Sequence, residues 1–503
     1  MNLYTSKQTK ILDRLAIKEQ RFTAFSLMQE AANFSFNTLL SYWPDTKQVF
    51  TFCGKGNNAG DGYLVASLAK EVGLESFVIQ ISNQKNLSQP SIKALKVSRS
   101  LDVKFITLKS FTKMSLNKAV LVDALLGTGI KGNVRKNVAN AIQIINQKST
   151  YHPVLSIDIP SGICADTGKE LGTAVMANLT TTFIGRKRGC YTSAGRSNSG
   201  TIEFSNLGIK KTTLNKVTSN YHILDMEKSL AKILNRPKNS HKGDFGHTLV
   251  IGGDSGYGGA AILASKAAIM SGSGLVSLAT QKEHISAALS SCPELMVNGV
   301  NSGQDLEDLL AKPNSIVIGP GLGQSAWSEQ MLQKTFIEAK KRNLPVVMDA
   351  DALNLLSTLK LASGTPKKLV ITPHPGEAAK LLKRSIEAIQ QDRFKSVMDL
   401  EKKLGAISVL KGSGSLVCSR INGIQKIGVC SAGNPGMAKG GMGDILSGLI
   451  GSFISQGLSL TAATEAAVDI HSKAADIAEL ELGELGLLPS DVINNIRYLL
   501  KSR

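Results

Sequence analysis

The stretch Gly440-Gly441-Met442-Gly443-Asp444 leads directly into an apolar segment, residues 445–450, whose composition predicts a helix. Three glycines in this short turn allow the backbone to approach a ligand closely and to adopt dihedral angles that other residues avoid. The first N–H groups of the helix have no partner within it, and the helix dipole favours negative charge there. The stretch therefore predicts a phosphate-binding turn at the start of a helix.

Asp444 ends this turn, where its negative charge would be repelled by a phosphate group. A carboxylate in that position can act as a base on a hydroxyl group beside the anion. The alternative is a capping residue at the start of an ordinary helix. The stretch by itself leaves both interpretations open, and the first makes Asp444 a candidate catalytic residue.

The length of 503 residues exceeds that of a typical single core and predicts two or more domains. Hydrophobic residues make up 42% and aromatic residues only 5%, and there are 47 glycines, which favours an α/β fold with tight turns. The six cysteines lie far apart without a Cys-x-x-Cys pair, which argues against a disulfide framework and against a zinc site.

The formal net charge of +19 is compatible with nucleic acid, an acidic surface or small anions as partners. The basic clusters Arg186-Lys187-Arg188 and Lys340-Lys341-Arg342 are short, so we expect them on solvated faces and predict no nucleic-acid partner. No apolar run has the length of a membrane span, and the first seven residues lack a signal-peptide core. We expect no membrane partner and a cytoplasmic location.

Strands and helices are expected to alternate in the first half, after a helical stretch at residues 7–40. A glycine loop, 54–62, is expected between the first strand and a helix that begins at Tyr63. The strands are expected at residues 49–53, 77–81, 119–126 and 154–157. This alternation predicts a mostly parallel sheet with ligands at the carboxyl ends of its strands.

A polar stretch, residues 205–240, precedes a second α/β series, and we predict domains at 1–220 and 221–503. Most strands of this series run into polar or glycine-rich turns, among them 349–352 and 372–377. The strands are expected at residues 248–251, 315–318, 345–348, 368–371, 406–410 and 415–418.

The loop Gly127-Thr128-Gly129-Ile130-Lys131-Gly132 has the pattern G-x-G-x-x-G after a predicted strand. A dinucleotide fingerprint also needs an acidic residue about 20 positions later, and residues 146–157 contain none. The loop is therefore a weak match to that fingerprint, although binding of another phosphate stays open. The chain has no G-x-x-x-x-G-K-[ST] sequence, which argues against a P-loop enzyme.

Asn58, Asp123 and Ser161 each lie near the end of a predicted strand. Amide, carboxylate and hydroxyl oxygens suit a hard cation, and their low total charge suits a monovalent one. The alternative is that each caps its own turn. Asp158 ends a strongly apolar strand, where it can hold a hydroxyl group, move a proton or cap a turn.

His374 lies between two prolines after a predicted strand, so its backbone is restricted. This favours contact with a substrate over a place in the core. The segment Lys411-Gly412-Ser413-Gly414-Ser415 combines a cation with flexible N–H donors and suits a nucleotide phosphate. A plain hairpin turn is the alternative for this segment.

Taken together, these motifs make nearly the whole chain resemble the bifunctional NAD(P)H-hydrate repair enzymes, in which a Rossmann-like epimerase domain precedes a ribokinase-like dehydratase domain. Ala59 stands where that family usually has glycine, and a positive φ there would be strained. The segments that carry the resemblance are 56–62, 123–129 and 158–162 for the epimerase, and 372–377 and 433–444 for the dehydratase.

The resemblance implies that the first domain binds the hydrated nucleotide and a potassium ion held by Asn58, Asp123 and Ser161. Acid help in breaking the C–O bond of the hydrate would come from Asp158 or Asp123. The residues that contact the hydrate would be Asn57, Asn58, Ala59, Gly60, Asp61, Gly127, Thr128, Gly129, Ile130, Lys131, Gly132, Asn133 and Asp158.

The resemblance also implies that the second domain binds the S hydrate beside an adenine nucleotide, usually ADP, with magnesium, and that Asp444 is its base. The residues facing the hydrate would be Gly259, Ala260, Gly321, Gly323, His374 and Asp444. Those holding the nucleotide would be Lys411, Gly412, Ser413, Gly414, Ser415 and Gly443.

The implied function is repair of NADHX and NADPHX, the hydrates of the reduced nicotinamide cofactors. The first domain would interconvert their R and S forms. The second would pass a phosphoryl group from ADP or ATP to the S hydroxyl and release phosphate. We expect a homo-oligomer. A ribokinase-like kinase acting on a vitamin alcohol and a non-catalytic binding protein remain as alternatives.

Overall fold

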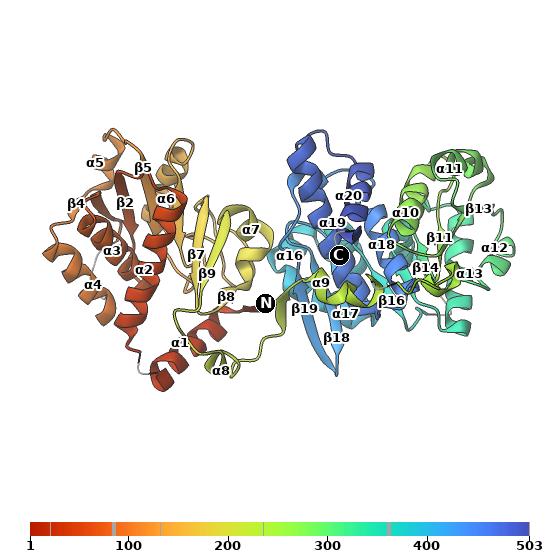
Figure 1. The fold of residues 1–503 in the computed structure, drawn as a ribbon, viewed down its shortest axis with the longest axis horizontal. Coiled ribbons are helices and arrows are strands. Elements are labelled where there is room, and N and C mark those ends of the chain that lie inside the picture. The colour runs from red at the N-terminus through yellow and green to blue at the C-terminus, as the bar shows by residue number, and fades with distance from the viewer. Residues whose placement is uncertain (21, 83–86, 131, 235, 360–363, 502–503) are drawn as a thin grey trace. The chain divides into compact units, whose positions relative to one another are not determined.

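A computed structural model describes residues 1–20, 22–82, 87–130, 132–234, 236–359 and 364–501. They form two compact units, Met1–Tyr221 and His222–Arg503. Each unit contains a twisted sheet with helices packed on it, so the predicted α/β fold class is confirmed (Figure 1). Among these residues, no helix combines the length and apolar character needed to cross a membrane.

Unit 1 is built on a parallel sheet that contains all of the strands expected in the first half of the chain. Its strands are β2 (Gln48–Cys53), β3 (Glu75–Gln80), β4 (Lys104–Ile106), β5 (Ala119–Ala124), β6 (Val154–Ile157), β7 (Leu179–Phe183) and β9 (Thr201–Ser205). Their order in the sheet is β4-β3-β2-β5-β6-β7-β9. The sequence did not predict β7 and β9, because their threonines and Glu203 hide the apolar pattern.

Helices cover both faces of this sheet, which explains the continuous apolar run of β2. Val49 and Cys53 pack into the core formed with α1 (Ser6–Gln20), α2 (Ala24–Tyr42), α3 (Asn57–Glu71) and α4 (Gln89–Ser100). Phe50 and Phe52 point the other way, because successive side chains of a strand alternate. They pack with α5 (Leu108–Thr112) and α6 (Lys136–Lys148).

Two helix boundaries in unit 1 differ from the prediction. The stretch at 7–40 is two helices, because Thr23 caps α2: its Oγ1 accepts from the Ser26 N–H at 3.0 Å, and the Ser26 hydroxyl accepts from the Thr23 N–H at 2.9 Å. Helix α3 begins at Asn57 rather than Tyr63, so residues 57–62 are helical and not a loop. Ala59 has no positive φ and is not strained.

The sheet of unit 2 contains every strand expected in the second half and others that were missed, β12, β13 and β19. The strands are β11 (His247–Ile251), β12 (Leu275–Thr280), β13 (Met296–Gly299), β14 (Ser315–Ile318), β15 (Val346–Met348), β16 (Leu369–Ile371), β17 (Ile407–Leu410), β18 (Leu416–Ile421) and β19 (Ile424–Val429). They lie in the order β13-β12-β11-β14-β15-β16-β17-β18-β19, parallel as far as β17 and antiparallel beyond it.

One face of this sheet packs with a large helical core whose centre is the helix that follows the 440–444 turn. This helix, α18 (Met442–Ser455), is buried along most of its length, which explains why it is apolar on all sides. Its neighbours are α9 (Met226–Leu234), α10 (Gly258–Met270), α19 (Leu460–Leu482) and α20 (Pro489–Lys501). The remaining long helices are α13 (Ala326–Arg342), α14 (Ala350–Thr358), α15 (Pro375–Leu382) and α17 (Arg393–Leu404).

Helices α10 and α18 approach so closely that Gly448 has no room for a side chain. The methyl group of Gly448→Ala would lie 2.1 Å from the Ala264 carbonyl oxygen, a backbone atom. The two helices must then separate, and we expect a loss of about 1–3 kcal/mol, seen as a lower thermal unfolding midpoint. Gly303→Ala, whose nearest neighbour would be 3.5 Å away, is the control. Equal midpoints for the two variants would contradict this packing.

Candidate active sites

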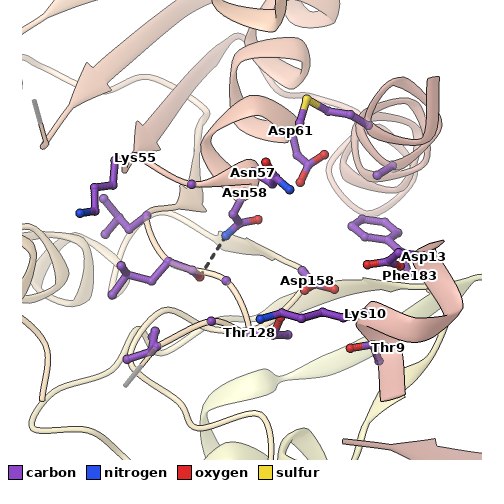
Figure 2. Close-up of a pocket in the computed structure, with 18 of the residues that line it drawn as sticks. Thr9, Lys10, Asp13, Lys55, Asn57, Asn58, Asp61, Thr128, Asp158 and Phe183 are labelled. Carbon is purple, nitrogen blue, oxygen red and sulfur yellow. Dashed lines mark hydrogen bonds between the residues drawn. The ribbon is translucent and has the colours of Figure 1, made fainter. Parts of the chain in front are cut away.

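Unit 1 contains a cavity of about 860 Å³ lined by α1, the start of α3 and the loops after β5 and β6 (Figure 2). The carboxyl ends of parallel strands meet at one edge, which brings these loops together. The lining includes most residues predicted to contact the hydrate, namely Asn57, Asn58, Asp61, Gly127, Thr128, Gly129, Ile130, Asn133 and Asp158.

The other predicted hydrate contacts lie elsewhere. Ala59 is buried within α3, and a Cβ on Gly60 would lie 2.5 Å from the Met28 sulfur, so Gly60 allows α3 to pack closely on α2. Gly132 has a positive φ of 76° and shapes the loop without lining the cavity. Lys131 is outside the described residues.

The side chains of Asn58, Asp123 and Ser161 meet around the backbone of Leu126. The Asn58 amide donates to the Leu126 carbonyl oxygen at 3.0 Å, and the Ser161 hydroxyl accepts from the Leu126 N–H at 2.8 Å. Ser161 also donates to Asp123 Oδ1 at 2.6 Å. Within the described chain, Asn58 Oδ1 is buried and has no hydrogen-bond partner. These hard oxygens, with one carboxylate among them, fit a monovalent cation.

Asp123 is fully buried and does not line the cavity. Its Oδ1 accepts from Ser161 and from the Leu125 N–H, and its Oδ2 accepts from Ser156 and from the Ser161 N–H. Burial raises the pKa of Asp123, and these hydrogen bonds oppose that rise. Because both oxygens are already occupied inside the fold, Asp123 organises the loops rather than reaching a ligand in the cavity.

Asp158 follows β6 with a positive φ of 69° and forms an ion pair with Lys187, which lies in β8 (Arg186–Lys187). Lys187 also donates to Thr182 Oγ1 at 3.2 Å and to the Phe183 carbonyl oxygen at 3.0 Å. Lys187 is only 3% exposed, so the expectation of a solvated face was wrong for this cluster. A buried ammonium group needs such hydrogen-bond and ion-pair partners. Because they come from other parts of the chain, the sequence alone does not reveal that Lys187 is buried.

Asp13 of α1 also lines the cavity, and sequence analysis missed it. It lies one turn from Thr9 and from Ala16, both buried, so helical periodicity alone could have placed it on the inner face. Burial raises the pKa of Asp13 to about 6, with Lys187 opposing and Asp158 adding to the rise. Burial, and then the charge of Asp158, raise the pKa of Asp61 well above its ordinary value.

In unit 2, Asp444 lies in the first turn of α18, which begins at Met442, earlier than predicted. Gly441 precedes it with a φ of 95°, which requires a glycine there. No hydrogen-bond or ion-pair partner of the Asp444 carboxyl group occurs among the described residues. Burial, followed by the charge of Asp349, raises its pKa to about 6, and Lys411 opposes the rise. This carboxyl group is therefore free to accept a proton.

Lys411 begins the loop between the antiparallel strands β17 and β18, so the 411–415 segment is a hairpin turn that also carries a cation. Its ammonium group lies 2.7 Å from Asp349 Oδ1 and 4.0 Å from Glu377 Oε2. Burial acts to lower the pKa of Lys411, but these two carboxylates outweigh it and raise that pKa. A Cβ on Gly443 would lie 3.1 Å from Lys411 Nζ, so the start of α18 reaches the same ion pair.

Sequence analysis noted Asp349 only as part of a polar turn. Its Oδ2 is buried and without a hydrogen-bond partner in the described chain, and a Cβ on Gly443 would lie 3.2 Å from it. An unsatisfied carboxylate oxygen of this kind fits a divalent cation with oxygen ligands. The neighbouring Glu377 has a pKa raised by burial to about 7, with Lys411 opposing.

The other predicted hydrate contacts of unit 2 form two groups. A Cβ on Gly321 would lie 3.2 Å from the Ala260 Cβ, so the start of α10, including Gly259, adjoins the 321–323 turn. His374 caps α15: its Nδ1 accepts from the Gly376 N–H at 3.0 Å. Burial, and then Lys411, lower the pKa of His374, so its imidazole is neutral at neutral pH.

The fold and sites thus define a two-domain α/β enzyme with separate polar sites at the strand ends of a Rossmann-like and a ribokinase-like unit. A family model described as NAD(P)H-hydrate dehydratase matches residues 248–497, and one described as YjeF-related protein N-terminus matches residues 24–189. The chain belongs to the family of bifunctional NAD(P)H-hydrate repair enzymes, as its full-length relatives show.

The enzyme of this family from Coxiella burnetii is 41% identical over 498 residues, covering 99% of each chain. The Escherichia coli enzyme is 36% identical, covering 95% of this chain and 90% of its own. A ribokinase-like superfamily protein from Enterococcus faecalis is 30% identical in sequence, with a TM-score of 0.50 over 56% of this chain and 96% of its own. These matches confirm the predicted family and the ribokinase-like fold of the second domain.

The raised pKa of Asp444 has a consequence for stability. The pKa is about 6 in the folded chain against an ordinary value of 3.8, so stability falls as pH rises between these values. The cost comes from burying the ionised carboxylate, and the uncharged amide of Asn avoids it. We therefore expect Asp444→Asn to be more stable than the wild type by about 1–3 kcal/mol at about pH 8, and by much less at about pH 4. Unfolding scans at both pH values measure this. A variant no more stable at the higher pH would contradict the raised pKa.

Proposed function

We propose that this chain repairs hydrated nicotinamide cofactors through two activities. Residues 1–220 interconvert the R and S forms of NADHX and NADPHX, and residues 221–503 dehydrate the S form with ADP, giving AMP and phosphate, or with ATP as the alternative donor. The observation that carries the proposal is the Asp444 carboxyl group, which has no partner in the described part of the chain and lies at the start of a buried helix beside the Lys411–Asp349 ion pair. The match to a dehydratase family favours this reaction over a vitamin kinase.

In unit 2, the hydroxyl group of the S hydrate gives its proton to Asp444 as its oxygen attacks the terminal phosphoryl group of the nucleotide. The free N–H groups at the start of α18 and the Lys411 ammonium group stabilise the charge on the transferring phosphoryl group. Phosphate then leaves with the bonding electron pair from C6, the ring carbon beside the nitrogen that carried the hydroxyl group, while the neighbouring ring carbon loses a proton. The double bond of the reduced cofactor is thereby restored. The residues near the nucleotide are Lys411, Gly412, Ser413, Gly414, Ser415 and Gly443.

Magnesium fits this site because Asp349 offers a buried carboxylate oxygen without a partner in the described chain. The ion would offset phosphate charge, with Asp349 as its protein ligand. The hydrate is bound by Gly259, Ala260 and the 321–323 turn, and by His374, which lies near Lys411 and Asp349. The neutral imidazole of His374 can donate or accept a hydrogen bond there without adding charge.

In unit 1, the hydrate occupies the cavity, and residues 127–130 and Asn133 of the loop after β5 lie against its phosphate groups. Potassium fits beside Asn58, Asp123 and Ser161, where Asn58 Oδ1 lacks a partner among the described residues and the Leu126 carbonyl oxygen adjoins it. The ion would tie the loop after β5 to the first turn of α3. A homo-oligomeric state and a cytoplasmic location remain predictions, as does the absence of nucleic-acid and membrane partners.

Asp444→Asn tests the dehydratase assignment. The variant keeps the shape of the side chain but cannot accept a proton, so we expect nucleotide-dependent repair to fall by at least about 100-fold. The assay mixes enzyme with R and S hydrates, ADP, magnesium and potassium, and follows the near-ultraviolet absorbance of the restored cofactor. Epimerisation should be unaffected, and Asp308→Asn, at an exposed position of another helix, should behave as the wild type. Repair at the wild-type rate in the Asp444 variant would refute the assignment.

Asn58→Ala tests the potassium site in unit 1. We expect potassium chloride, compared with tetramethylammonium chloride, to raise the thermal midpoint of the wild type but not of the variant, because the buried amide oxygen is lost. Epimerisation should lose its dependence on potassium, while dehydration of the S hydrate should continue. Asn33→Ala, at an exposed site on α2, is the matched control. Equal stabilisation of the Asn58 variant and the wild type by potassium would place the ion elsewhere.

A further inference from the structure

The cavity of unit 1 brings three carboxyl groups together with a single buried cation among the residues that the structure describes. Asp13 enters from α1, Asp61 from α3 and Asp158 from the loop after β6, and all three point into the same space (Figure 2). The other charged residues lining the cavity are Lys10, Lys55, Arg135 and Lys187. Of these, only Lys187 is fully buried, and its ammonium group is already bound to Asp158.

The ion pair with Lys187 distinguishes Asp158 from the other two carboxyl groups. The Asp158 carboxylate is already bound by the buried Lys187 ammonium group. Asp13 and Asp61 have no hydrogen-bond or ion-pair partner among the described residues, although both line the cavity. A negative charge on one of them raises the cost of ionising the other, and the charge of Asp13 contributes to the raised pKa of Asp61.

We propose that Asp13 and Asp61 are the acid–base pair of the epimerase, acting on opposite faces of the hydrated ring. This inference rests on the proposed epimerase function and names the residues that move its protons. An enzyme that inverts a carbinol carbon must deliver a proton on one face and remove one on the other. Side chains that enter the cavity from two different helices can meet both requirements.

The proposed reaction starts from the S form, with Asp61 protonated and Asp13 ionised. The C6–O bond breaks with its electron pair on oxygen, which takes the Asp61 proton and leaves as water, while the ring nitrogen shares its lone pair with C6. The resulting cation faces the Asp158 carboxylate, held in place by Lys187, a positioning residue. Water then adds to the opposite face of C6 and gives a proton to the Asp13 carboxylate. Proton exchange with solvent afterwards restores protonated Asp61 and ionised Asp13, and the R form reacts by the reverse sequence from the enzyme in which Asp13 is protonated.

The pKa values agree with this division of roles. Burial raises the pKa of Asp13 to about 6, so Asp13 is ionised at neutral pH. Burial, followed by the charges of Asp158 and Asp13 and opposed by Lys187, raises the pKa of Asp61 well above its ordinary value, which favours its protonated form. One group is then an acid and the other a base in the resting enzyme, as two-face catalysis requires.

The test uses the full-length chain, the isolated S hydrate and no nucleotide, so that only epimerisation occurs. Chromatography that separates the diastereomers follows the R form as it appears. We expect Asp13→Asn and Asp61→Asn each to lower kcat by at least about 100-fold with a much smaller change in KM. The wild-type kcat/KM should depend on pH as a bell with its acidic limb near the Asp13 pKa of about 6.

Controls keep the outcomes distinct. Both variants should dehydrate the S hydrate with ADP at the wild-type rate, which shows that unit 2 is intact, and potassium should raise their thermal midpoints as it does for the wild type, which shows that unit 1 is folded. Asp45→Asn, an exposed carboxyl in unit 1, should epimerise normally. Wild-type epimerisation in either cavity variant overturns the acid–base pair. A wild type that dehydrates the S hydrate but does not epimerise it overturns the proposed function of unit 1 instead.

Discussion

Parallel strands end at the same edge of a sheet, and the rest of this structure depends on that constraint. In unit 2, β11, β14, β15, β16 and β17 all end at the edge where their turns and the start of α18 meet. In unit 1, β2, β5 and β6 do the same around the cavity. Backbone N–H groups at helix starts and polar side chains collect there without disturbing the apolar cores on either face of each sheet.

Both sites place several carboxyl groups close to a single lysine. A buried Lys187 pairs with Asp158 and a partly buried Lys411 pairs with Asp349, and each pair leaves further carboxyl groups without a partner among the described residues. Burial raises the pKa values of those remaining groups, which include Asp13 and Asp444, each to about 6. Such groups destabilise the folded chain at neutral pH, and they exchange protons there, which is the property that proton-transfer chemistry needs.

Sequence patterns predicted much of the fold because the two sheets are buried on both faces. The apolar runs of β2, β5 and β14 were visible for that reason, and the glycine-rich turns after them marked their ends. The misses have physical causes as well. The threonine-rich β7 is buried by tertiary packing rather than by its own hydrophobicity, and α3 begins within a glycine-rich segment that resembles a loop.

The sequence alone determined the fold class, the family and the local motifs, including the turn before Asp444 and the three oxygen donors Asn58, Asp123 and Ser161. Each of these depends on residues that are close together in the sequence or on short motifs shared with a known family, so a single sequence is enough to recognise them. Only the tertiary structure decided which charges are paired. Lys187, expected on a solvated face, is the buried partner of Asp158, and Asp13, which the sequence did not single out, lines the cavity. The sequence could not show this, because burial and counter-ions depend on residues distant in sequence.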